Sequence, residues 1–187
     1  MSSNRTSDLP FVGGAGVGIV TWIVGYVLTY LVVAPDIRDS SINRLVEAFG
    51  GAPATYEMVG WVFFNAHFVD VDAPSLIGGA GSANLISQAD GGSLSLLFVL
   101  PPLLLIVAGV VAGRAADASD PDGGARAGAF VLAGYLPLAV VGAFLFRYTV
   151  GDGSVAPTLV TAVLLAGVVY PVVFGAIGGA VSSLLRD

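Results

Sequence analysis

Residues 11–33 read FVGGAGVGIVTWIVGYVLTYLVV, a run of 23 residues without a charged side chain. At about 1.5 Å per residue such a helix is about 35 Å long, enough to cross the hydrocarbon core of a bilayer. A signal peptide is the alternative, because Arg5 precedes the run and Val32-Val33-Ala34 resembles a weak cleavage site. Since the apolar cores of signal peptides are only about 7 to 15 residues long, the run predicts a transmembrane helix.

Three further windows lack charge and are long enough to span: 94–113, 127–146 and 155–185. The whole chain of 187 residues is 56% hydrophobic and only 11% charged, which is not the composition of a soluble domain. We therefore expect an all-α integral membrane protein in which residues 1–187 form a single membrane domain with four transmembrane helices. The lipid bilayer is its first predicted partner.

The segment between the first two spans, 34–93, is less apolar and predicts two short helices. The first follows Asp39-Ser40-Ser41, residues of the kind that cap helices, and has apolar side chains with the spacing of one helix face: Ile42, Leu45, Val46 and Phe49. The second covers 56–69, and its apolar core of 12 residues is too short to cross a bilayer. Both are expected to be interfacial or re-entrant, whereas 70–92 predicts a loop.

Aromatic residues dominate the second of these short helices. Its rings come from Trp61, Phe63, Phe64 and Phe68. Rings of this size bury about 150 to 250 Å² each, so leaving them in water would be unfavourable. We expect this helix to dock on the four spans.

The charged residues exclude several kinds of chemistry. All 7 basic residues are Arg, there is no Cys, and there is one His. Without Lys the chain lacks a Walker A loop and a Schiff base, and without Cys or a second His it lacks the usual ligands of iron–sulfur clusters, thiolate zinc and bis-His haem. We expect no cofactor, no nucleotide and no nucleic acid as partners, and the function is expected not to be enzymatic.

Acidity is the second unusual property, since 13 acidic residues give a net charge of -6. Surface carboxylates keep a protein hydrated in concentrated salt, so the composition suggests a halophilic archaeon, with an actinobacterium as the alternative. Arg positions near the span ends favour cytoplasmic N- and C-termini in the cell membrane, with 34–93 outside. Four Arg residues then lie inside (5, 114, 126, 186) and three outside (38, 44, 147).

The densest polar cluster comprises Asn65, His67, Asp70 and Asp72. His67 and Asp70 are three positions apart and would share a helix face, which permits a carboxylate–imidazole pair or part of a metal site. Because a second His is absent, structural hydrogen bonding is the favoured interpretation. No residue is assigned a catalytic, cofactor-binding or metal-binding role.

Within the spans, Pro137 and Pro171 each remove a backbone hydrogen bond and predict helix kinks, which serve packing or, alternatively, line a substrate path. Four G-x-x-x-G pairs predict close helix packing within one bundle, or an oligomer face: Gly14/Gly18, Gly109/Gly113, Gly124/Gly128 and Gly175/Gly179. No span interior contains Asp, Glu, Arg or His, which weighs against an ion-coupled pump.

Two segments carry a resemblance to a protein family: GWVFFNAHFV over 60–69 and GYVLTY over 25–30. With them, most of the chain resembles a group of small, uncharacterised multi-pass membrane proteins of haloarchaea. The resemblance implies the habitat and four-span topology, and it implies no activity.

For function, the sequence favours an accessory or structural subunit that packs against other membrane proteins or against copies of itself. A passive channel or small-solute transporter acting as an oligomer is the second hypothesis. A membrane enzyme using His67 and Asp70 is the third.

Overall fold

The computed structural model describes residues 5–40, 54–73, 81–89, 93–150 and 153–185. Within these residues, four helical segments are long and apolar enough to cross a membrane: Phe11–Arg38, Leu94–Ala115, Pro121–Leu145 and Leu159–Leu184. The four windows predicted from the sequence are thereby confirmed as long apolar helices. The fourth begins later than predicted, since 155–157 belongs to a β-strand.

The first span is one helix, α1 (Arg5–Arg38), whereas the other three are built from shorter helical pieces. The second joins the 3₁₀ helix η2 (Ser93–Val99) to α5 (Leu100–Ala115). The third joins α6 (Pro121–Ala129) to α7 (Leu132–Leu145). The fourth consists of α8 (Leu159–Thr161), the π-helix η3 (Ala162–Val169) and α9 (Tyr170–Leu184).

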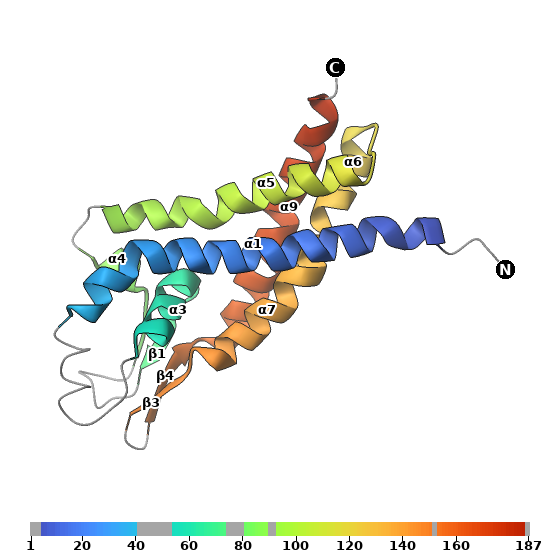
Figure 1. Ribbon diagram of the computed structural model, residues 1–187. Helices are drawn as coiled ribbons and strands as arrows, with labels where there is room; N and C mark the ends of the chain where they lie inside the picture. The colour runs from blue at the N-terminus through green and yellow to red at the C-terminus, as the bar shows by residue number, and fades with distance from the viewer. Residues whose placement is uncertain (1–4, 41–53, 74–80, 90–92, 151–152, 186–187) are drawn as a thin grey trace.

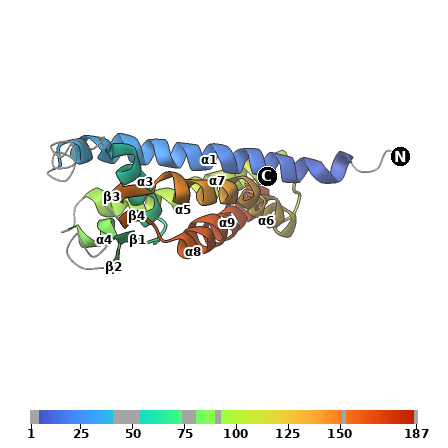
Figure 2. The ribbon, with the colours of Figure 1, turned by 90° about the horizontal axis from the view of Figure 1, so that it is seen from below.

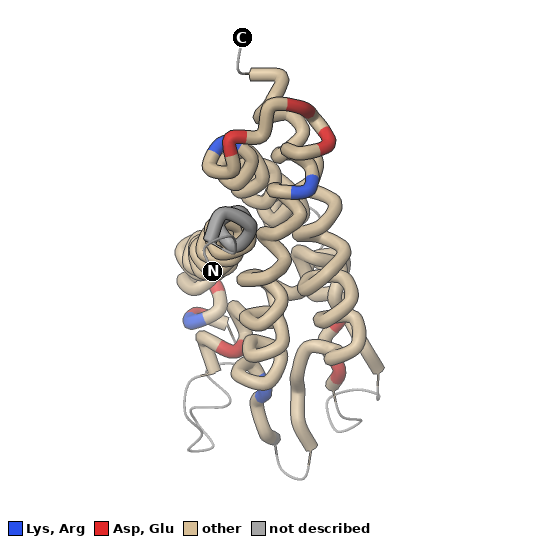
Figure 3. The backbone as a smooth tube through the Cα atoms, turned by 90° about the vertical axis from the view of Figure 1, so that its right-hand side faces the viewer, with Lys and Arg blue, Asp and Glu red and all other residues tan. Residues whose placement is uncertain are grey.

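The spans form a bundle with two different ends (Figures 1 and 2). Both termini and the connection between α5 and α6 lie at one end, and the short helices and strands lie at the other (Figure 1). Charged residues gather towards these two ends and leave a broad uncharged zone between them (Figure 3). This distribution matches a chain whose middle lies in hydrocarbon.

Glycines bring α5, α6 and α9 into direct backbone contact. A Cβ added at Gly109 or Gly128 would overlap the carbonyl oxygen of Gly175, and one added at Gly124 would overlap that of Gly179. On α1, Gly14 and Gly18 face the backbone of Phe130 and Val131 in the same way. The interpretation of the four G-x-x-x-G pairs as packing within one bundle is therefore confirmed.

The two prolines have different surroundings. Pro137 lies inside α7, which continues through it, so that the carbonyl of Ala133 loses its usual intrahelical donor. Pro171 is the second residue of α9, which directly follows the π-helix η3. A proline ring crowds the carbonyl four residues before it, here that of Gly167, and the wider π-turn gives that carbonyl room.

The aromatic short helix is α3 (Thr55–Asn65), which packs on α1 as predicted. It ends earlier than expected because Phe68 adopts a left-handed conformation, with φ of 57°. The backbone N–H groups of Phe68 and Val69 donate to the carbonyls of Asn65 and Phe64, the pattern of a Schellman cap. The other predicted short helix, over 41–49, lies outside the described residues.

A small antiparallel sheet corrects the prediction of an all-α fold and of a loop over 70–92. Its strand order is β2-β1-β4-β3. Two strands come from the segment after α3, β1 (Val71–Ala73) and β2 (Gly81–Ala83), and α4 (Leu85–Gln88) follows them. The other two, β3 (Tyr148–Val150) and β4 (Gly153–Pro157), join the third and fourth spans. The sheet arises because β1 pairs with β4, far away in sequence, a contact that no local pattern reveals.

Candidate functional site

The best-defined polar site lies where α3 meets α1 and α7. Aromatic side chains pack between these helices and hold α3 in place. The ring of Phe146 covers the backbone of α3 at Gly60, where any Cβ would overlap it. Trp61 Nε1 donates to the carbonyl of Phe146 at 2.7 Å. The ring of Phe63 stands edge-on to Trp22 of α1, with centroids 5.3 Å apart. These contacts hold α3 on the spans, so that the residues directly after it lie in the interior of the protein.

Three of the four predicted aromatic rings are buried, as expected: Trp61, Phe63 and Phe64. Phe68 is the exception, with 56% of its surface exposed. Its left-handed backbone turns it away from the helix, and its ring stacks on Phe98 of η2 at a centroid distance of 4.5 Å.

His67 follows α3 and is completely buried. Its Nδ1 lies 2.8 Å from the carbonyl oxygen of Phe63, and its Nε2 lies 2.7 Å from the hydroxyl of Tyr135 on α7. Its ring also lies 5.0 Å from that of Tyr170, at the start of α9. His67 therefore connects the segment after α3 with the third and fourth spans.

These two hydrogen bonds assign the protons of His67. A carbonyl oxygen only accepts, so Nδ1 carries the hydrogen and donates to Phe63. Nε2 is then the acceptor, and the Tyr135 hydroxyl donates to it. Burial lowers the pKa of His67 to about 4, although the hydrogen bond to the Phe63 carbonyl opposes that shift. The imidazole is consequently neutral at neutral pH.

Asn65 forms the second half of the site, and it too is completely buried. Its Nδ2 donates to the carbonyl of Val69 at 2.7 Å, while its Oδ1 accepts from the backbone N–H of Leu85 at 2.9 Å. Its carbonyl accepts from Nδ2 of Asn84, the N-cap residue of α4, at 3.0 Å. One amide side chain thus fastens the end of α3 to the start of α4.

The two carboxylates of the predicted cluster lie with the sheet. The carbonyl of Asp70 accepts from the backbone N–H of Thr158 at 2.9 Å, and Asp72 Oδ1 accepts from the Thr158 hydroxyl at 2.7 Å. The helix ends at Asn65, so His67 and Asp70 do not share a helix face, and the ring nitrogens of His67 contact Phe63 and Tyr135 instead. The predicted cluster therefore divides into two pairs. Asn65 and His67 are buried, whereas Asp70 and Asp72 lie with the sheet.

This arrangement suits a structural role, in which hydrogen bonds join parts of the fold, better than a catalytic role. A general base needs a nitrogen within reach of its substrate, whereas both nitrogens of His67 are occupied and its ring is sealed from solvent. Among the residues that the structure describes, no three His, Cys, Asp or Glu side chains are grouped to hold a metal ion. Structural hydrogen bonding, the interpretation favoured by the sequence, agrees with this geometry.

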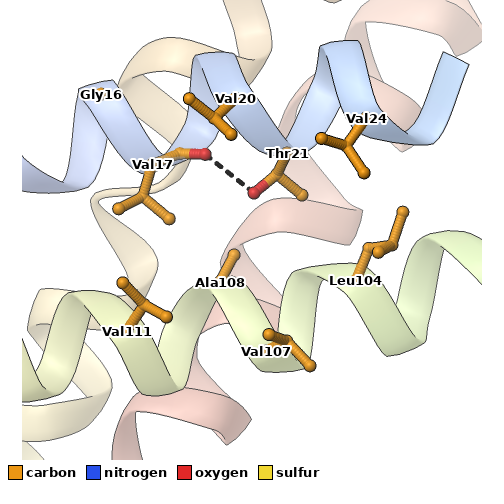
Figure 4. A pocket seen from close by; sticks show the side chains of 9 residues that line it. All are labelled: Gly16, Val17, Val20, Thr21, Val24, Leu104, Val107, Ala108 and Val111. Carbon is orange, nitrogen blue, oxygen red and sulfur yellow. Dashed lines mark hydrogen bonds between the residues drawn. The ribbon is translucent and has the colours of Figure 1, made fainter. Parts of the chain in front are cut away.

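A second candidate site is an apolar groove of about 380 Å³ between α1 and α5 (Figure 4). Val17 and Val24 of α1 lie opposite Val111 and Leu104 of α5 across it (Figure 4). Its polar lining group, Thr21, already donates its hydroxyl to the carbonyl of Val17 at 2.8 Å. The groove is therefore a purely apolar surface on the outside of the bundle.

A family model matches residues 1–186 of this chain, nearly its whole length. The chain belongs to DUF7978, a family of unknown function. No curated protein and no solved structure matches it. In this DUF7978 member, the buried pair of Asn65 and His67 and the groove between α1 and α5 are the two candidate functional sites.

Sequence reasoning missed several partners in the site. Tyr135 and Phe146 both lie within the charge-free window 127–146, and no local pattern there indicates a contact with His67 or Trp61. The hairpin of β3 and β4 did have a local signal, since Tyr148-Thr149-Val150 is β-prone and is followed by the turn residues Gly-Asp-Gly.

Proposed function

We propose that this protein is an accessory or structural subunit of the cell membrane that binds a transmembrane helix of another membrane protein. The observation that carries the proposal is the groove between α1 and α5. In lipid, helices associate through close van der Waals contact at small residues, and Gly16 at the groove lets a partner backbone approach. The absence of a free polar group on Thr21 favours an apolar partner surface.

The closed interior of the bundle supports a binding role over transport. The hydroxyl of Thr29 donates to the carbonyl of Gly25, and that of Ser182 donates to the carbonyl of Gly179. Both hydroxyls are buried and already paired with carbonyls, so neither offers a free polar group to a solute. The backbone contacts at Gly109 and Gly175 leave little room between α5 and α9.

The alternative function is a passive channel or small-solute transporter formed by several copies. In that case the path would run between copies of the chain, with the groove as part of the contact. The two functions differ in what the groove binds, which is a different polypeptide in the first and the same polypeptide in the second.

Orientation and habitat belong to this proposal as well. Both termini lie in the cytoplasm, because the short connection between α5 and α6 carries Arg114 and Arg126 near span ends. The habitat is that of a haloarchaeon, since 13 acidic residues face 7 basic ones and all of the latter are Arg. Thermal stability should then rise from low to molar salt, as the Debye length falls from about 10 Å at 0.1 M to about 3 Å at 1 M.

The groove offers a matched pair of variants for the test. A Cβ at Gly13 or at Gly16 would meet no atom within 4 Å, so Leu fits at either position, but only Gly16 lines the groove. Tagged wild type, Gly16→Leu and Gly13→Leu are purified from native membranes in mild detergent at high salt, and the bound polypeptides are identified by mass spectrometry.

We expect a distinct membrane protein to accompany the wild type and Gly13→Leu, and to be lost from Gly16→Leu. Retention of the same partner by all three proteins would contradict binding at the groove. If an untagged copy of the chain is the only polypeptide lost with Gly16→Leu, the oligomeric alternative replaces the proposal.

A further inference from the structure

Glu57 is a buried carboxylate in the first turn of α3, with 5% of its surface exposed. Its Oε2 is enclosed and has no hydrogen-bond partner among the residues described. A carboxylate removed from water is strongly unfavourable unless a positive charge or hydrogen-bond donors compensate it. This oxygen atom therefore points to a partner other than the described side chains.

Glu57 lies at the N-terminal end of α3. The N-terminal amides of α3 have no side-chain cap at Ala54, and the positive end of a helix stabilises a nearby anion. A side-chain hydrogen bond with Glu57 raises the pKa of Tyr56 above its ordinary value, so the Tyr56 hydroxyl lies beside the carboxylate. A cation near this helix end would compensate the buried, unpaired Oε2.

The cationic side chain at the end of α1 is engaged elsewhere. Arg38 donates from Nη2 to the hydroxyl of Tyr30 at 2.6 Å, and its guanidinium carbon lies 5.6 Å from the centre of the Tyr30 ring. On the same helix, Tyr26 donates its hydroxyl to the carbonyl of Tyr56 at 3.1 Å. A phenol that donates keeps lone pairs for accepting, so Tyr26 and Tyr56 bring neutral oxygen atoms to the neighbourhood of Glu57.

We propose that Glu57 binds a hard monovalent cation, with Tyr26 and Tyr56 supplying further oxygen ligands. Carboxylate and neutral oxygen atoms select hard cations over soft ones. One carboxylate carries one negative charge, which a monovalent ion neutralises. Since Tyr26 belongs to α1 and Glu57 to α3, the bound cation would fasten the short helix to the first span.

The test measures thermal unfolding of the full chain in mild detergent, at constant ionic strength, while sodium chloride replaces choline chloride. Choline is a bulky quaternary ammonium ion that does not act as a hard cation towards oxygen ligands, and the constant ionic strength keeps nonspecific screening the same in both salts. Sodium at roughly ten times its dissociation constant should raise the Tm of the wild type by about 3 to 6 °C. Glu57→Gln should lose this sodium-specific increment.

Asp122→Asn is the matched control, because Asp122 is also an acidic residue in the first turn of a helix, α6, but is exposed. It should keep the full sodium response. Tyr56→Phe keeps the test informative if Glu57→Gln does not fold, since Tyr56 is about half-exposed and its hydroxyl can be removed without leaving a cavity. It should raise the half-saturating sodium concentration several-fold.

Three results would overturn the proposal. The first is an equal Tm of the wild type in sodium and choline chloride. The second is an unchanged sodium response in Glu57→Gln or in Tyr56→Phe. The third is a wild type that, in choline alone, loses less stability between pH 7 and pH 5 than Glu57→Gln does, because Glu57 would then hold a proton in place of a cation.

Discussion

The hydroxyl of Tyr135 donates to Nε2 of His67 across 2.7 Å, and this bond joins the segment after α3 to the third span. Both side chains are buried, with 0% of His67 and 2% of Tyr135 exposed. Because Nδ1 is already paired with the carbonyl of Phe63, each polar atom of the imidazole has one partner. Both nitrogens of the imidazole are hydrogen-bonded, so removing either His67 or Tyr135 should lower the stability of the fold.

Tyr135→Phe should destabilise the protein by about 1–3 kcal/mol, because it leaves Nε2 of His67 buried without a donor. The measurement is the free energy of unfolding in mild detergent. The double variant His67→Phe/Tyr135→Phe is the control, since it removes both partners, and its loss should be smaller than the sum of the single losses. Additive losses would show that the two side chains are not coupled.

Acid should weaken the fold through His67. Its pKa is about 4 in the folded protein and about 6.5 in an unfolded chain, so the unfolded state takes up the proton first. Stability is then complete above pH 6.5 and falls as the pH decreases towards 4, by about 3 kcal/mol in all. Unfolding measured between pH 7 and pH 5 should show this slope, and His67→Phe should abolish it in that window, where most carboxylates stay ionised. A slope that persists in the variant would assign the effect to other groups.

Gly109→Ala should destabilise the bundle by about 1–3 kcal/mol, because the new methyl group would overlap the carbonyl oxygen of Gly175 and force α5 away from α9. Gly13→Ala serves as its control, since a Cβ there meets nothing within 4 Å. Thermal unfolding of the two variants should differ clearly. Equal stabilities would contradict the close approach of α5 and α9.

At Phe68, glycine should be tolerated better than alanine. The positive φ of 57° is unfavourable for any residue with a Cβ, and glycine removes that penalty of about 1 kcal/mol. Both variants lose the stacking on Phe98, so the difference between their stabilities reports only the cost of the left-handed backbone conformation. Phe68→Ala should therefore unfold at a lower temperature than Phe68→Gly, and the reverse order would contradict the left-handed cap.

Cysteine labelling tests the orientation cleanly, because the chain has no Cys of its own. Ser119, in the connection between α5 and α6, and Ser82, in β2 at the other end, are both exposed. In intact cells an impermeant thiol reagent should label Ser82→Cys and spare Ser119→Cys. Rapid labelling of Ser119→Cys with protection of Ser82→Cys would reverse the topology.

The amino-acid sequence by itself determined the number and approximate bounds of the long apolar helices. A run such as 11–33 excludes charge over its whole length, and crossing hydrocarbon depends on that local property alone. The sequence also determined that 56–69 cannot cross a membrane and that its rings need a surface to cover them. Where α3 would end was not visible, because a cap at Phe68 contradicts the usual preference for glycine at that position.

Tertiary structure alone decided which groups meet. Tyr135 lies 68 positions from His67, Phe146 lies 85 positions from Trp61, and Thr158 lies 86 positions from Asp72. Each of these contacts depends on how the spans cross, and helix crossing depends on backbone approach at glycines such as Gly109 and Gly175. Local composition cannot reveal such pairs, because the same apolar run fits many neighbours and only the packed bundle selects one.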